Sequence, residues 1–163
     1  MDKRLRAEHG VVCRLPGERF GYFGWPTVAR MEDGTLVAAS NTALGTVAGA
    51  TTVSAGAELQ ISGSGLTVAE LLNLNGTGVG GGGALRNLAN TNSVTGAVTL
   101  QSASSITSDA GTLTLSGAGN IAGAFPLTVG GAGNTTISKV IATGAGMLTK
   151  DGAGTLTLSG ANT

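Results

Sequence analysis

The sequence predicts an all-β chain whose longer part is a β-solenoid, and three observations carry that prediction. The octamer Gly-Thr-Leu-Thr-Leu-Ser-Gly-Ala occurs at 111–118 and again, unchanged, at 154–161. Repetition at a fixed period is typical of a chain built from one stacked unit. Leucine and threonine alternate inside the octamer, as in a strand with one buried and one solvated face. Glycines flank the Thr-Leu-Thr-Leu-Ser stretch in each copy, and they allow the tight turns that short stacked strands need.

Composition divides the chain into two segments. Most charged residues lie before residue 35, although the whole chain has a formal net charge of zero. All aromatic residues except Phe125 also lie near the start, at Phe20, Tyr22, Phe23 and Trp25. We therefore expect an N-terminal hairpin segment at 1–42 and a β-solenoid at 43–163. The balanced charge gives no basic stripe for nucleic acid.

The N-terminal segment contains one clear hairpin signal. Apolar runs at 28–30 and 36–38 flank Glu32-Asp33-Gly34. An Asp-Gly pair between two apolar runs is a strong indicator of a tight β-turn. The sequence therefore predicts an antiparallel pair of strands around Gly34.

The longer segment contains short apolar alternations bounded by Gly, Asn, Asp or Ser. They lie at 52–61, 66–68, 72–74, 98–100, 127–129 and 137–140. A disordered glycine-rich chain would not need them, and low charge also argues against disorder. The near absence of aromatic residues disfavours a β-sandwich. If the spacing of 43 residues covers two coils, each has roughly 20 residues, and about six coils make a rod of about 29 Å.

The repeated octamer also predicts which side chains form the core. We expect Leu113, Leu115, Leu156 and Leu158 to face inward, and Thr112, Thr114, Thr155 and Thr157 to face solvent. A glycine-rich coil offers few other apolar groups to bury.

Residues 146–163 resemble the autotransporter-associated β-strand repeat of bacterial surface proteins. They contain Leu-Thr-Lys, then Gly-Ala-Gly, then Thr-Leu-Thr-Leu-Ser-Gly-Ala-Asn-Thr. Segments 74–79, 83–88 and 107–115 resemble the degenerate coils that precede this repeat in such proteins. The resemblance covers about 43–163 and implies a right-handed parallel β-helix in an exported passenger domain at the cell surface. It also implies a signal sequence and a C-terminal outer-membrane barrel as partner in a full-length parent; this chain contains neither, and we expect it to be a fragment.

The segment at about 11–40, and residues 20–40 within it above all, resembles the first hairpin of sialidase-like β-propellers. An aromatic-x-x-Pro pattern enters a strand, and an Asp-Gly turn follows. Sialidases carry an arginine two residues before that proline, where it grips the substrate carboxylate; here the position is Gly24. The rest of that active site has no counterpart, so the resemblance implies no inherited activity.

No residue set in the sequence predicts catalysis, a cofactor or a metal. The single His9 has no partners for a catalytic triad, and the single Cys13 has none for a disulfide or a zinc site. Glu32 and Asp33 are adjacent and belong to a turn, rather than forming an acid–base pair. The sequence therefore predicts no enzyme, no catalytic residue, no metal and no cofactor.

Two other patterns resemble known phosphate-binding and calcium-binding sites only in part. Gly80–Gly83 lacks the Gly-Lys-Ser/Thr that completes a phosphate-binding loop, so we expect a flexible corner there. Asp109 and Asp151 alone do not supply the repeated aspartates of a calcium-binding β-roll.

The outward threonines resemble those of ice-binding solenoids. Thr112 with Thr114, and Thr155 with Thr157, form Thr-x-Thr pairs, and Thr99, Thr128 and Thr149 stand in comparable contexts. Threonine also suits any solvated β-surface, and long loops interrupt the pairs. We interpret them as a solvated face.

The function expected from the sequence is structural. It is a rigid stalk, display rod or adhesion scaffold of an autotransporter-like surface protein, with end-to-end self-association through Leu156 and Leu158. The alternatives are a fragment of a sialidase-like glycoside hydrolase and a threonine-rich solenoid that binds ice or polysaccharide.

Overall fold

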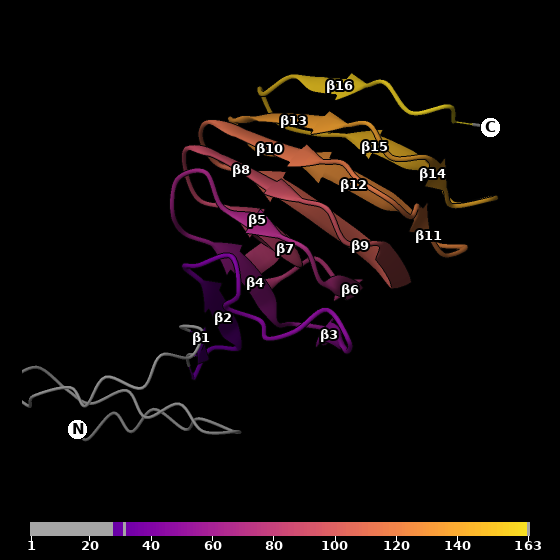
Figure 1. Ribbon diagram of the computed structural model, residues 1–163. Coiled ribbons are helices and arrows are strands. Elements are labelled where there is room, and N and C mark those ends of the chain that lie inside the picture. The colour runs from indigo at the N-terminus through magenta and orange to yellow at the C-terminus, as the bar shows by residue number, and fades with distance from the viewer. Residues whose placement is uncertain (1–27, 31, 163) are drawn as a thin grey trace, which may run out of the picture.

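The computed structural model describes residues 28–30 and 32–162, and this part of the chain is a β-solenoid. Parallel strands stack in about six coils, with β1 and β2 at one end and β16 at the other (Figure 1). The predicted all-β solenoid is therefore confirmed, including its number of coils.

The predicted hairpin is also present. Strand β1 (Val28–Arg30) pairs antiparallel with β2 (Thr35–Ala38), with Val28 opposite Ala38 and Arg30 opposite Leu36. Strand β2 then pairs in parallel with β4 (Glu58–Ile61) of the next coil. The second strand of the hairpin is thus also a strand of the first coil, and Ala38 and Ala43 both lie in the buried core.

Each coil visits three faces in turn. The first face stacks β2, β4, β7 (Leu85–Asn87), the C-terminal half of β9 (Val98–Ser108), β12 (Leu127–Gly130) and β15 (Leu148–Lys150). The second face stacks β5 (Thr67–Val68), β8 (Thr91–Val94), β10 (Thr112–Leu115), β13 (Asn134–Ile137) and β16 (Leu156–Leu158).

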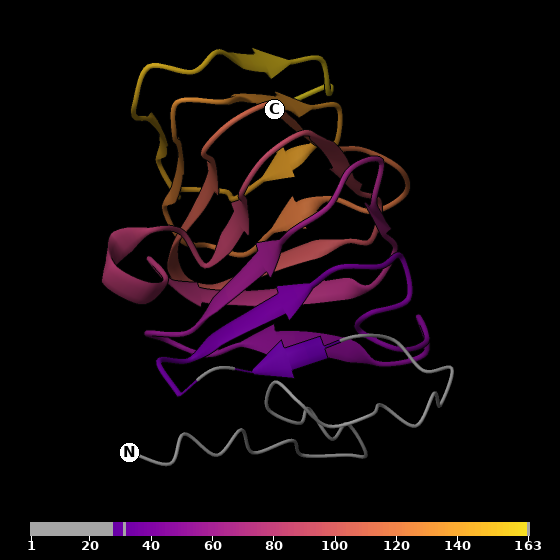
Figure 2. The same ribbon diagram turned by 90° about the vertical axis from the view of Figure 1, so that its left-hand side faces the viewer.

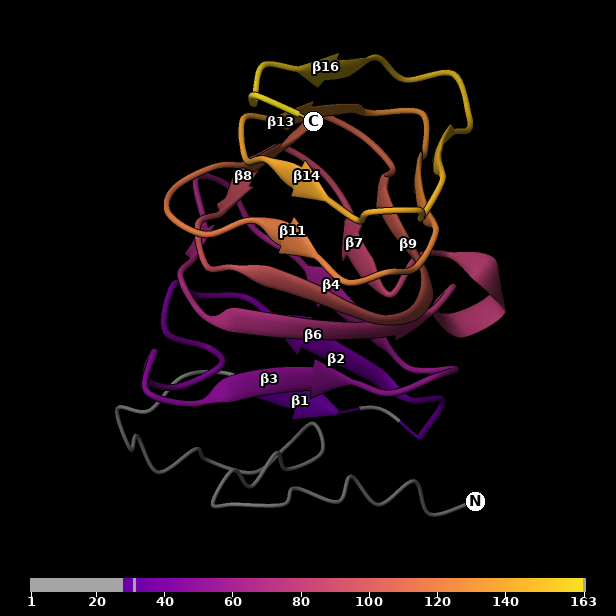
Figure 3. The same ribbon diagram turned by 90° about the vertical axis from the view of Figure 1, so that its right-hand side faces the viewer.

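The third face, toward the viewer in Figure 3, stacks β3 (Ala50–Val53), β6 (Leu71–Gly76), the N-terminal half of β9, β11 (Ile121–Ala122) and β14 (Ile141–Ala142). The long strand β9 joins the third face to the first. A short 3-10 helix, η1 (Val79–Gly81), projects from the side of the stack (Figures 2 and 3).

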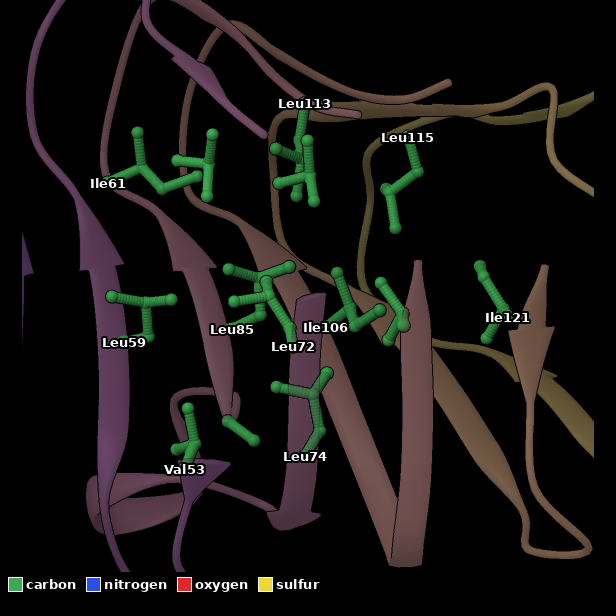
Figure 4. Close-up of a cluster of buried hydrophobic side chains, with 14 of the residues drawn as sticks. Val53, Leu59, Ile61, Leu72, Leu74, Leu85, Ile106, Leu113, Leu115 and Ile121 are labelled. Atoms are coloured by element: carbon green, nitrogen blue, oxygen red, sulfur yellow. The ribbon is translucent and has the colours of Figure 1, made fainter. Parts of the chain in front are cut away.

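The core consists of columns of apolar side chains that run along the stack. On the first face Leu59, Leu85 and Ile106 are successive register partners, and on the second face Val94, Leu115 and Ile137 are. All six are fully buried. Figure 4 shows side chains from opposite faces pointing toward one another across the interior. Because parallel register places like side chains above each other, each coil buries the apolar groups of its neighbours.

The two copies of the octamer lie two coils apart, as predicted. Leu113 partners Thr135, and Thr135 in turn partners Leu156. Leu113 and Leu115 are fully buried, and Thr112 and Thr114 lie on the outer surface, which confirms the inward and outward assignment for the first copy.

The second copy is buried only in part. Leu156 packs against the core, whereas Leu158 is 43 % exposed although it is in register with the buried Ile137. Strand β16 has a neighbour on one side only, so nothing among the described residues covers the other side of its leucines.

Two predicted strands have different limits in the structure. The alternation at 52–61 is divided between β3 and β4 by a turn in which the Ala57 amide donates to the Ser54 carbonyl at 2.9 Å. The prediction of a strand at 137–140 is wrong, because β13 ends at Ile137 and the residues after it form a corner of the coil. Lys139 is buried at that corner and bonds backbone carbonyls there.

Candidate functional site

The outer surface of the sheet β5–β8–β10–β13–β16 carries hydroxyl and amide side chains in parallel ranks. We call it the hydroxyl face. Its central rank follows the strand register through five coils: Thr67, Ser93, Thr114, Thr136 and Thr157.

A second rank lies two residues earlier along each strand. Thr91, Thr112 and Asn134 are register partners, and the Thr155 amide donates to Oδ1 of Asn134 at 3.0 Å. A third rank lies two residues later, at Thr95, Ser116, Ser138 and Ser159. The backbone amide of each of these four residues donates to a carbonyl of the preceding coil, so the register of the strands continues to this position. From β8 to β16 every outward position of the three ranks is therefore Thr, Ser or Asn.

The fold fixes the spacing of these groups. Neighbouring strands lie about 4.8 Å apart, and two residues along a strand span roughly 6.6 Å. Side chains of one rank are close enough to touch, and Thr67 Oγ1 lies 3.0 Å from Ser93 Oγ. All these side chains remain partly or fully exposed. The surface is a regular two-dimensional array of hydrogen-bonding groups.

The hydroxyl face is larger than the sequence predicted. The Thr-x-Thr pair itself occurs in this sheet only at 112–114 and 155–157. Ser93 and Asn134 replace one threonine of the pair in the coils of β8 and β13, and they continue the ranks there. Thr99, Thr128 and Thr149 belong to the other two faces. When the sequence is aligned with itself at half of the 43-residue spacing, Thr91 and Asn134 fall beside Thr112. This alignment is the sequence signal that identifies them as members of the rank.

The charged groups of the described residues lie outside the hydroxyl face. On the first face Arg86 Nη1 is 3.3 Å from Oε1 of Glu58, and Arg86 Nε donates to Oδ2 of Asp109 at 2.9 Å. The hydrogen bond to Asp109 raises the pKa of Arg86. Glu58 is only 1 % exposed, and its Oε2 accepts no hydrogen bond from the described residues. An almost fully buried carboxylate of this kind is held by its partners and stabilises local geometry rather than binding from solution.

The glycine run covers this charged cluster. A Cβ on Gly82 would lie 2.7 Å from both Arg86 Nη1 and Glu58 Oε2, so a larger residue there would have to push the ends of these two side chains aside. The corner expected at Gly80–Gly83 is present, in the form of η1 and the residues after it. A carboxylate directly beneath the loop disfavours a phosphate there, in agreement with the missing Gly-Lys-Ser/Thr pattern.

The remaining candidates from the sequence do not assemble into a site. His9, Cys13 and Gly24 lie outside the described residues. Glu32 and Asp33 are exposed in the hairpin turn, where the Thr35 amide donates to Asp33 Oδ1 at 2.9 Å and lowers the pKa of that carboxyl. Asp109 pairs with Arg86, while Asp151 is exposed in a different coil. Within 28–30 and 32–162, no three His, Cys, Asp or Glu side chains gather closely enough to hold a metal ion.

Lys139 is the one buried amine of the described residues. It is 2 % exposed, and its Nζ donates to the carbonyls of Thr95 at 3.1 Å and Ala118 at 3.0 Å. These two carbonyls belong to corners of the two preceding coils, so the side chain ties three coils together. Burial disfavours the ammonium form and lowers the pKa of Lys139 below its ordinary value of 10.5.

Comparison of the chain with protein-family models, with curated proteins and with solved structures finds no match. The part of the chain that the structure describes contains no helix long and apolar enough to span a membrane.

The buried amine predicts a specific pH dependence. Because the folded-state pKa of Lys139 lies below its unfolded value, the unfolded chain holds the extra proton between the two values. The free energy of unfolding should therefore rise with pH in the alkaline range below about 10.5, and Lys139→Met should remove that rise. Urea titrations of both proteins at several pH values measure the difference. A difference between them that does not change with pH would contradict this account.

Proposed function

We propose that this chain is a non-catalytic structural segment of a bacterial autotransporter-like surface protein, in which it forms a rigid stalk or display rod. The observation that carries the proposal is the continuous apolar interior, in which the strands of the first and second faces stack in register from β2 to β16. A solenoid of this kind is rigid along its stacking axis, and its outer faces stay accessible to solvent. The repeat at 146–163 resembles that of exported passenger domains, and this resemblance supports a location at the cell surface.

The proposal includes the absence of enzymatic activity. Glu58 and Asp109 both form ion pairs with Arg86, and every outward position of the three ranks from β8 to β16 is Thr, Ser or Asn, so the hydroxyl face itself supplies no carboxylate or histidine as a general base. A hydroxyl needs such a base or a lowered pKa to act as a nucleophile. Release of a fluorophore from a sialoside by the purified chain would speak for the rival sialidase-like function.

The surface location can be tested at the level of the gene. We expect the genomic DNA around the coding sequence to encode an export signal upstream, and further repeats and an outer-membrane barrel downstream. A chain joined to a signal and a barrel should then display an epitope tag to antibody on intact cells. Flanking DNA that encodes neither part, or a tag that stays inaccessible in such a fusion, would refute the surface assignment.

We also propose that the chain self-associates through the coil that contains β15 and β16. Both strands pair with a neighbour on one side only, and the same coil exposes Leu158 and the 68 % exposed Met147. Open strand edges with apolar side chains recruit further strands, and the commonest source in a pure solution is a second copy.

Light scattering at increasing protein concentration tests this association. We expect the average mass to rise with concentration, and Leu156→Lys with Leu158→Lys to suppress the rise while the chain keeps its β-sheet circular dichroism. Thr157→Ser, on the outer side of the same strand, is the matched control and should associate like the parent. A monomer that persists at high concentration would show that the edge recruits no second copy.

A further inference from the structure

We propose that the hydroxyl face is a binding surface for ice crystals. This inference goes beyond the structural role proposed above and does not depend on it. It rests on the order, the chemistry and the rigidity of the three ranks.

The hydroxyl face is ordered in two dimensions. The ranks repeat about every 4.8 Å along the stack and roughly every 6.6 Å along the strands. The strand register carries this order through β8, β10, β13 and β16 without a shift. The water molecules on an ice surface also form a regular two-dimensional lattice, with spacings of similar size. A surface that presents hydroxyls on such a grid holds its first layer of water in a comparable array.

The side chains of the central rank hold their hydroxyls in fixed positions. Four of the five residues in the central rank are threonines, whose branched Cβ restricts χ1 and so fixes the hydroxyl in space. Each threonine also brings a methyl group, which limits the ways in which nearby water can be arranged. No Asp, Glu, Lys or Arg occupies any position of the three ranks. An ion would orient water around itself and break the lattice.

The composition of the hydroxyl face favours ice over a polysaccharide as its ligand. Sugar rings present apolar C–H faces, and they stack best on flat aromatic side chains. Phe125 is the only aromatic residue of the described chain, and it lies between β11 and β12 rather than on the hydroxyl face. The face therefore offers hydrogen bonds but no stacking platform.

The hydroxyl face is also preorganised. Strands β8, β10 and β13 each pair with a strand on both sides, and their inward residues Val94, Leu115 and Ile137 are fully buried. The backbone beneath the central ranks is thus fixed before any ligand arrives. A rigid array loses little conformational entropy on binding.

The test uses the full chain and an ice recrystallisation assay, in which the growth of ice grains in a frozen sucrose solution is followed with time. We expect the purified protein to slow grain growth and to lower the freezing point below the melting point. Thr136→Lys, in the middle of the central rank, should abolish both effects. Thr99→Lys introduces the same charge at an exposed position on the third face and should keep both effects.

Circular dichroism establishes that each variant is folded. If Thr136→Lys does not fold, Thr157→Lys on the edge strand β16 takes its place and should weaken both effects. Co-sedimentation with microcrystalline cellulose and with chitin forms a second arm. A folded parent protein that leaves ice growth unchanged overturns the proposal, and if it then sediments with either polysaccharide, the face binds glycans instead. Equal activity of Thr136→Lys and the parent, or equal loss in Thr99→Lys, would also overturn it.

Discussion

The structure depends on one constraint, which is that parallel coils stack in register so that each inward side chain lies on its counterpart from the neighbouring coil. The columns Leu59–Leu85–Ile106 and Val94–Leu115–Ile137 are the direct result. A coil by itself is too thin to bury a leucine, so the apolar surface leaves water only where coils meet. The same register aligns the outward residues, and the hydroxyl face is therefore a consequence of the core.

The corners have to respect the same spacing. A Cβ on Gly111 would lie 2.2 Å from the Asn90 carbonyl oxygen of the preceding coil, and this glycine has a φ of +72°, so both contact and conformation require glycine there. Polar corners are closed by hydrogen bonds: Asn87 and Asn92 are buried and bond each other, and Lys139 bonds carbonyls of two earlier coils. Two buried oxygens have no hydrogen-bond partner among the described residues, Oε2 of Glu58 and Oγ1 of Thr135, and both belong to strands rather than to corners.

Much of the fold could be predicted because local patterns encode it. Local patterns of a few residues indicate the Asp33-Gly34 turn and the alternation at 112–115. The distance of two coils between the octamers could be predicted because the two copies are identical in sequence. The hydroxyl face was underestimated because Ser93 and Asn134 differ from threonine in identity but not in position, and position is decided by register between coils. Lys139 could not be foreseen as a buried residue, since its partners lie in two other coils.

The stability of the fold comes from the inward columns and not from the outward ranks. The most direct measurement is the free energy of unfolding of Leu115→Ala and of Thr114→Ser, two neighbouring residues of β10 that point to opposite sides. We expect Leu115→Ala to cost about 2–5 kcal/mol, because it empties part of a fully buried column, and Thr114→Ser to cost less than about 1 kcal/mol. Equal losses in the two variants would contradict the in-register core.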